Sequence, residues 1–169
     1  MPATYDKIAT TTLGSANATI TFSSIAATYT DLRLVFNNTG ASATGVGTPT
    51  MRFNSDTASN YSITRIAGQG TVAAATSDAS QTVMNLASYT APQTTVPLLI
   101  TVDLFSYAGS TNKTCLITYN NDYNGGGSVE YAVGLYRSTS AITSISITSA
   151  GASTWSTGTI ATLYGILKA

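Results

Sequence analysis

The chain has 169 residues, with seven basic and seven acidic side chains, no histidine and a net charge of zero. A chain without histidine cannot form a serine triad and lacks the commonest proton shuttle near neutral pH. A chain without net charge has no field that would draw it to DNA, RNA or an anionic membrane. The composition therefore argues against triad hydrolases and against nucleic acid as a partner.

The length suits a single domain that spans residues 1–169, with a sizeable core. The polar residues are mainly hydroxyl and amide side chains, and the chain has ten tyrosines but few charged residues. Threonine, valine, isoleucine and tyrosine all suit a half-buried strand. We therefore expect an all-β domain with little or no helix.

In chain order, alternating apolar and hydroxyl residues are separated by clusters of Gly, Asn, Ser and Asp. This pattern is typical of short antiparallel strands and predicts about ten of them. The clearest lie at 18–22, 32–36, 98–105, 113–119, 129–136 and 144–148. The segment 98–105 is apolar on both sides, which predicts a central strand. Together the strands predict an antiparallel β-sandwich that is jelly-roll-like.

One segment departs from this pattern. Residues 71–80 cluster alanine with serine and threonine, and we expect an extended surface loop there. The single cysteine, Cys115, lies in a predicted strand, so we expect a buried, unreactive thiol and no metal site.

No apolar run reaches the roughly 18 residues that a membrane span needs. The first residues lack a signal-peptide pattern, so we expect synthesis in the cytoplasm without export or membrane insertion.

The densest polar stretch runs from Arg52 to Arg65. Its alternate oxygen donors are similar to the start of a calcium loop, but Ala58 stands at the fourth such position and the required glycine is missing. We favour a hairpin or strand-to-strand corner in which Asn54 and Asp56 cap the turn by bonding to their own backbone, with Arg52 or Arg65 pairing with Asp56. A carbohydrate contact is the alternative. The candidate residues of this stretch are Arg52, Asn54, Asp56, Asn60, Tyr61 and Arg65.

The positions of the acidic residues give little support for a catalytic function. Six of the seven acidic residues lie in or beside polar, turn-like or strand-end segments, and Asp103 alone lies within an apolar strand. We expect Asp103 to point to solvent or to pair with an arginine or tyrosine. Tyr123 and Trp155 lie in predicted loops, and we expect their rings to be exposed for a sugar or a subunit interface. We expect no catalytic residue and no cofactor.

Seven segments carry a resemblance to a known family: 5–13, 20–25, 29–32, 52–56, 59–62, 134–138 and 163–166. Together they resemble small virion structural proteins of tailed bacteriophages, cyanophages among them, which serve as tail, fibre or head-decoration proteins. The resemblance implies a virion location, self-association as a trimer, contacts with other virion proteins and no catalytic residues. The alternative function is a glycan-binding adhesin module of a phage fibre, for which the partner would be a host surface glycan.

Overall fold

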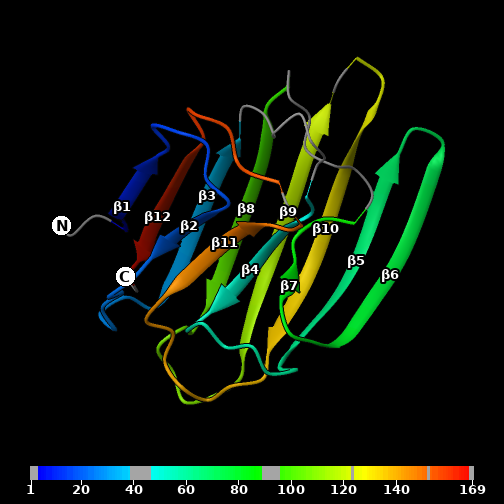
Figure 1. The fold of residues 1–169 in the computed structure, drawn as a ribbon. Helices are drawn as coiled ribbons and strands as arrows, with labels where there is room; N and C mark the ends of the chain where they lie inside the picture. The colour runs from blue at the N-terminus through cyan, green and yellow to red at the C-terminus, as the bar shows by residue number, and fades with distance from the viewer. Residues whose placement is uncertain (1–3, 39–46, 89–95, 123, 152, 168–169) are drawn as a thin grey trace.

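The computed structural model describes residues 4–38, 47–88, 96–122, 124–151 and 153–167. Their regular structure consists of twelve strands, without helix, in two antiparallel sheets that form two layers (Figure 1). These ranges accordingly hold no helix long and apolar enough to cross a membrane. The predicted all-β antiparallel sandwich is confirmed, with two strands more than expected, whereas the jelly-roll connection stays a prediction.

The large sheet has eight strands in the order β1-β12-β3-β8-β9-β10-β5-β6. The first and last strands of the chain pair at one side, and β8 lies between β3 and β9, as its apolar sequence predicts. The bounds are β1 Tyr5–Thr12, β3 Asp31–Asn38, β5 Tyr61–Gln69, β6 Val72–Gln81, β8 Leu98–Phe105, β9 Lys113–Asp122, β10 Gly127–Tyr136 and β12 Ile160–Ile166.

The small sheet has four strands in the order β2-β11-β4-β7. It lies across one side of the large sheet, and the β5–β6 hairpin extends beyond it (Figure 1). We call the side that it covers the inner face of the large sheet and the opposite side the outer face. The bounds are β2 Thr19–Phe22, β4 Pro49–Phe53, β7 Met84–Asn85 and β11 Ile145–Ser149.

The hydrophobic core lies between the two sheets. Phe36 and Ile100 from the large sheet, and Phe53 and Ile147 from the small sheet, have no exposed surface. Alternation explains this placement, because every second residue of a strand faces the same side. Cys115 also lies in this core, as predicted, and burial raises the pKa of its thiol to about 12. The thiol is therefore protonated and unreactive at neutral pH.

The prediction that Trp155 is exposed was wrong. Trp155 has no exposed surface, and its ring packs edge-on against Phe36 with 4.9 Å between ring centroids. Its backbone pairs with Asn17 in an isolated bridge, which holds this part of the loop against the sandwich. A ring of this size stabilises a small domain most when it leaves water, and a loop can bury it as well as a strand can.

The prediction of a surface loop at 71–80 was also wrong. These residues belong almost entirely to β6, an edge strand that pairs with β5 along most of its length. Alanine and serine are weak strand formers, but strand preference depends on context, and an existing neighbour supplies the hydrogen bonds. The ladder offered by β5 therefore outweighs the local composition.

Replacement of the buried ring gives a first prediction. We expect Trp155→Ala to lower the free energy of unfolding by about 3–5 kcal/mol, because it leaves a cavity beside Phe36. The measurement is guanidinium unfolding followed by circular dichroism. Val72→Ala, at an exposed position of β6, is the control and should stay within about 0.5 kcal/mol of the wild type. Equal small effects of both changes would contradict the packing described here.

Candidate functional site

The polar stretch after β4 forms a tight corner. The backbone N–H of Asp56 donates to the carbonyl of Phe53 over 2.9 Å, and the two residues between them, Asn54 and Ser55, have φ of 52° and 56°. Two successive left-handed residues are the signature of a type I′ turn. Asparagine tolerates this conformation better than most residues, which explains its position here.

Asn54 fastens this corner to the loop before β11. Its side-chain amide donates to the carbonyl of Ala141 over 2.8 Å. Its side-chain oxygen accepts from the backbone N–H of Thr143 at 2.8 Å and of Ser144 at 3.2 Å. The prediction that Asn54 caps its own turn was wrong, because its side-chain donor and acceptor are both engaged by the loop before β11.

Asp56 is held by neutral donors. Its carboxylate accepts from the side chain of Asn60 and the backbone N–H of Ala58, both at 2.8 Å, and from the hydroxyl of Tyr136 at 3.0 Å. The bonds from Asn60 and Ala58 lower the pKa of this carboxyl group below its ordinary value. The predicted arginine pair is wrong: Arg52 donates to the carbonyl of Thr82 over 3.2 Å, and Arg65 lies in a different cluster.

Tyr61 completes the corner from inside the core. Its side chain is fully buried, and its hydroxyl accepts from the backbone N–H of Phe53 over 3.1 Å. Its ring stacks on Tyr136 with 4.9 Å between centroids, and burial raises the pKa of its hydroxyl to about 12. The structure thus brings together Asn54, Asp56, Asn60 and Tyr61, and their bonds hold the fold.

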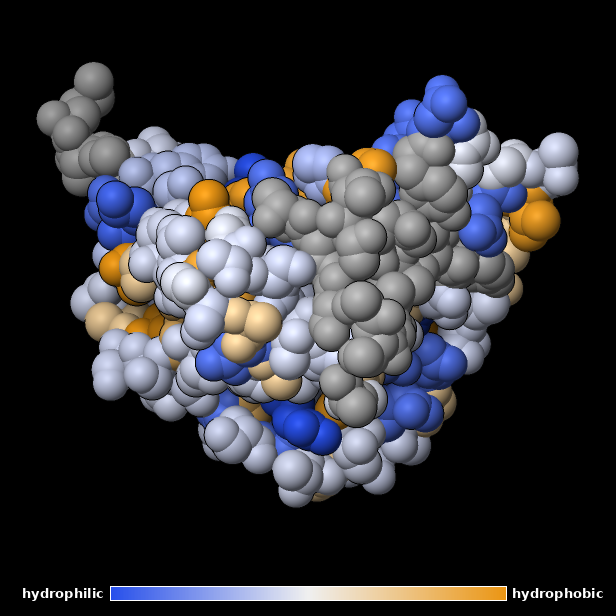
Figure 2. Space-filling view, turned by 45° about the horizontal axis from the view of Figure 1, so that its top comes forward, coloured by the Kyte–Doolittle hydropathy of each residue, from blue (hydrophilic) through white to orange (hydrophobic). Residues whose placement is uncertain are grey.

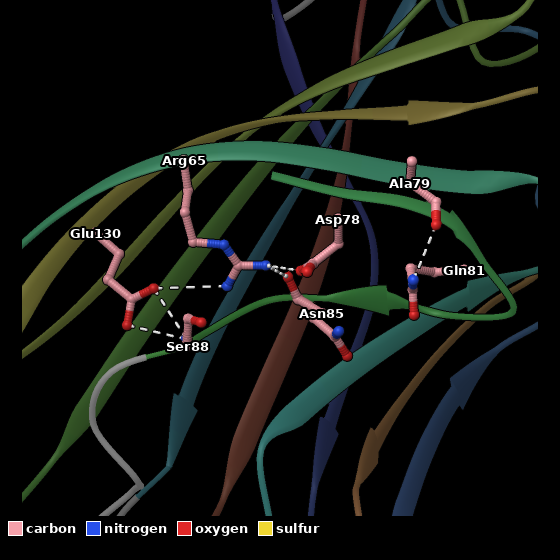
Figure 3. A network of polar contacts seen from close by, with 7 residues as sticks. All are labelled: Arg65, Asp78, Ala79, Gln81, Asn85, Ser88 and Glu130. Atoms are coloured by element: carbon pink, nitrogen blue, oxygen red, sulfur yellow. Dashed lines mark hydrogen bonds and ion pairs between the residues drawn. The ribbon is translucent and has the colours of Figure 1, made fainter. Parts of the chain in front are cut away.

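Arg65 lies at the centre of a second polar cluster, on the inner side of β5 (Figure 3). Its guanidinium contacts Asp78 at 3.1 Å, Glu130 at 3.7 Å and the carbonyl of Asn85 at 3.3 Å. Both carboxylate oxygens of Glu130 accept from the backbone N–H of Ser88, at 3.1 and 3.0 Å. The side chains of Arg65 and Glu130 are only 1% and 2% exposed. The cluster therefore ties the segment after β7 to β5, β6 and β10.

The remaining candidates do not form a site with these residues. Trp155 is buried against Phe36, and Tyr123 lies outside the described residues. Asp103 pairs with Arg33 across neighbouring strands through two contacts of 2.7 and 2.8 Å, which confirms the predicted partner. Among the residues that the structure describes, no group of three or more Cys, Asp or Glu side chains is placed to hold a metal ion.

The orientation of β10 could not be deduced from its alternation. Glu130, Ala132 and Tyr136 are buried at 2%, 4% and 2% exposure, whereas the larger apolar side chains of Val129 and Tyr131 point outward at 63% and 48%. Two of these inward residues contact specific neighbours: Glu130 meets Arg65, and Tyr136 meets Tyr61. The outer face of the large sheet therefore carries apolar side chains of β10.

Strand register extends this face across the whole sheet. Residues paired across antiparallel strands point to the same side, so each set of partners forms a row perpendicular to the strands. The first outer row contains Ala73, Gly68, Val129, Asn120, Leu99, Asn37, Ile160 and Thr12. The second outer row contains Ala75, Ile66, Tyr131, Thr118, Thr101, Val35, Thr162 and Thr10. Neither row contains a charged residue.

A shallow depression of about 570 Å³ opens at one end of these rows, over β6, β5 and β10. Gly68 lies among its lining residues, with Ile66, Val129 and Tyr131. A Cβ atom built on Gly68 meets no other atom within 4 Å, so the missing side chain leaves open space. Ile66 and Val129, both 63% exposed, stand beside this notch. The outer face thus combines a hole with protruding apolar side chains.

The side of the molecule turned to the viewer in Figure 2 has a different character. Pale colours of intermediate hydropathy dominate there, and strongly hydrophilic and hydrophobic residues are spread over the surface. The sequence held one signal for the outer face, since Val129, Tyr131, Val133 and Leu135 form an apolar row along β10. Such a row must either enter the core or form an exposed apolar patch.

Comparison with known proteins finds no relative of this chain. No family model, no curated protein and no solved structure matches this chain.

The corner predicts a pH dependence. The pKa of Asp56 is lowered in the folded protein, so its stabilising effect is present above the ordinary value of 3.8 and is lost as the pH falls through the folded value. We expect the difference in free energy of unfolding between wild type and Asp56→Asn to be largest near neutral pH and to shrink in acid. Urea unfolding at a series of pH values measures it. A difference independent of pH would contradict this account.

The buried cluster predicts non-additive effects. We expect Glu130→Ala to lower the free energy of unfolding by about 3–5 kcal/mol, because it removes one partner of a buried charge. The double variant Arg65→Met/Glu130→Leu should lose less than the sum of its two single changes, since no unpaired buried charge remains. A double-mutant cycle by guanidinium unfolding measures the coupling, and simple additivity would count against the ion pair.

Proposed function

We propose that this protein is a non-enzymatic structural subunit of a tailed-phage virion, which self-associates and attaches to the capsid or tail as a decoration, knob or fibre component. The observation that carries the proposal is the pair of adjoining uncharged rows on the outer face of the large sheet, with exposed side chains at Ile66, Val129 and Tyr131. Exposed apolar patches of this kind mark interaction surfaces in proteins. The phage assignment rests on the family resemblance.

The polar chemistry of the chain supports a structural role. Asp56 is engaged at the corner, Asp103 pairs with Arg33, and Glu130 pairs with Arg65. These carboxylates hold strands and loops together, and a catalytic group would instead need to reach a substrate. The segments that carry the resemblance also fall on β1, β2, the start of β3, the corner, the end of β10 and β12, which are elements that build the fold.

The alternative, a glycan-binding module of a phage fibre, loses the side chain on which it most depended. Trp155 is buried, so its ring cannot stack on a sugar. The exposed ring of Tyr131 stands among Val129, Ile66 and small residues of the depression, which offer few groups to bond sugar hydroxyls. An apolar protein surface suits this face better.

The proposal predicts that the protein is part of the particle. We expect mass spectrometry of purified virions of the phage that encodes the chain to detect it in a copy number that follows the symmetry of its attachment site. Cryo-electron microscopy of the same particles would then place it on the capsid or the tail. Its absence from virions purified free of host-cell debris would refute the proposal.

A further inference from the structure

We propose that the depression over Gly68 is the centre of a two-fold interface in which the outer faces of two copies of this chain pack together. The inference rests on the proposed function, which requires self-association, and it names the surface, the partner and the register. Three properties of the outer face support a second copy as the occupant: its shape, its charge and its size.

The shape is self-complementary. A two-fold interface needs protrusion and hollow on the same patch, because each copy offers the same surface to the other. On β5, the protruding Ile66 and the open position Gly68 are two residues apart and point to the same side. A two-fold axis that lies between the sheets and runs across the strands, midway between the two outer rows, places Ile66 of each copy opposite Gly68 of the other.

The same operation matches the rest of the rows. It places Val129 of one copy against Tyr131 of the other, and Leu99 against Thr101. On β8 and β10, apolar residues thus meet apolar residues or threonine, which contributes a methyl group and a hydroxyl that can bond within its own sheet, whereas on β3 Val35 meets Asn37. Thr101 and Thr118 already share such a bond of 2.6 Å across β8 and β9. No unpaired hydroxyl is therefore forced against the partner at this position.

The charge also suits a partner of the same kind. Two identical surfaces bring like charges together unless the patch is neutral or its charges are paired, and like charges in an interface cost several kcal/mol. Neither outer row carries a charged residue. In the adjoining row, Arg33 and Asp103 neutralise each other through their ion pair, and Lys7 lies at the end of the row on β1. A basic or acidic partner would gain little from the two uncharged rows.

The size is sufficient for a stable dimer. Eight strands spaced by about 4.8 Å, with outward side chains along about 20 Å of each strand, give a footprint near the roughly 800 Å² that each partner buries in a standard interface. A footprint of this length takes in the two uncharged rows and also the adjoining row that holds Lys7, Arg33 and Asp103. Two sheets can stack in this way at about 10 Å, as the layers of a sandwich do. The interface makes a dimer, and the trimer implied by the family resemblance would need a different surface.

The test fills the notch without harming the fold. Gly68→Val adds a β-branched side chain at an exposed strand position with open space and ordinary backbone geometry, so the variant should fold. Gly14→Val is the matched control, because Gly14 also has open space around its Cβ position but lies in the loop after β1. Circular dichroism and thermal unfolding of both variants verify folding.

Analytical ultracentrifugation then measures self-association of the purified full chain over a wide range of concentrations. We expect the wild type and Gly14→Val to form dimers with the same affinity, and Gly68→Val to dimerise at least about tenfold more weakly, since an added side chain overpacks the interface. A monomeric wild type, a trimer, or undiminished dimerisation of Gly68→Val would overturn the inference. Virions that contain the protein would leave the proposed function standing in each of these cases.

Cross-linking tests the register directly. Ile66→Cys and Gly68→Cys are prepared as separate proteins, mixed, and treated with a short bifunctional thiol reagent, because sheets about 10 Å apart hold opposite Cα atoms beyond the reach of a disulfide. We expect a covalent dimer that joins one variant to the other. Each variant alone should cross-link far less, because the two-fold axis keeps identical positions apart. Cys115 is buried and does not compete. Cross-linking that is equal in the single-variant samples, or absent from the mixture, would rule out this arrangement.

Discussion

Arg65 and Glu130 meet on the inner side of neighbouring strands, and their ion pair settles which side of β10 is buried. Side chains alternate along a strand, so a strand that points Glu130 inward must point Val129 and Tyr131 outward. The pair itself is costly to bury, and the backbone N–H of Ser88 and the carboxylate of Asp78 supply the further contacts that make it tolerable. The apolar outer face follows from this one polar arrangement.

The unequal widths of the two sheets give that face its extent. Four strands cover part of one side of an eight-stranded sheet, and the β5–β6 hairpin extends beyond the cover. There, Arg65 and the segment after β7 close the inner side in place of strands. The hairpin can therefore extend without an apolar inner surface, while its outer side continues the rows of the sheet. The polar cluster and the outer depression lie on opposite sides of the same strands.

Sequence patterns predicted those structural features that depend mainly on residues close together in the chain. Alternation identified most strands, and Asp103 within the apolar strand 98–105 was expected to point to solvent or to pair with an arginine or tyrosine, of which Arg33 is the observed partner. The corner residues Asn54 and Asp56 were recognisable because their side chains favour turns. Burial of Trp155, the pairing of β6 with β5 and the inward side of β10 depend instead on contacts between distant segments. Arg65 and Glu130 are far apart in sequence, and nothing near either one indicates the other.

These contacts show how the few charged residues of this chain are used in the fold. Two of the arginines and three of the acidic residues are used in the ion pairs of Arg33 and Arg65, which stabilise the sheet from its two sides. What remains on the outer rows is neutral, so two copies can approach without like-charge repulsion. Neutrality alone would permit many registers between the two copies, because a flat uncharged face does not favour one relative position over another. The open position at Gly68 beside the protruding Ile66 favours one register, since only there does a side chain fill the hollow.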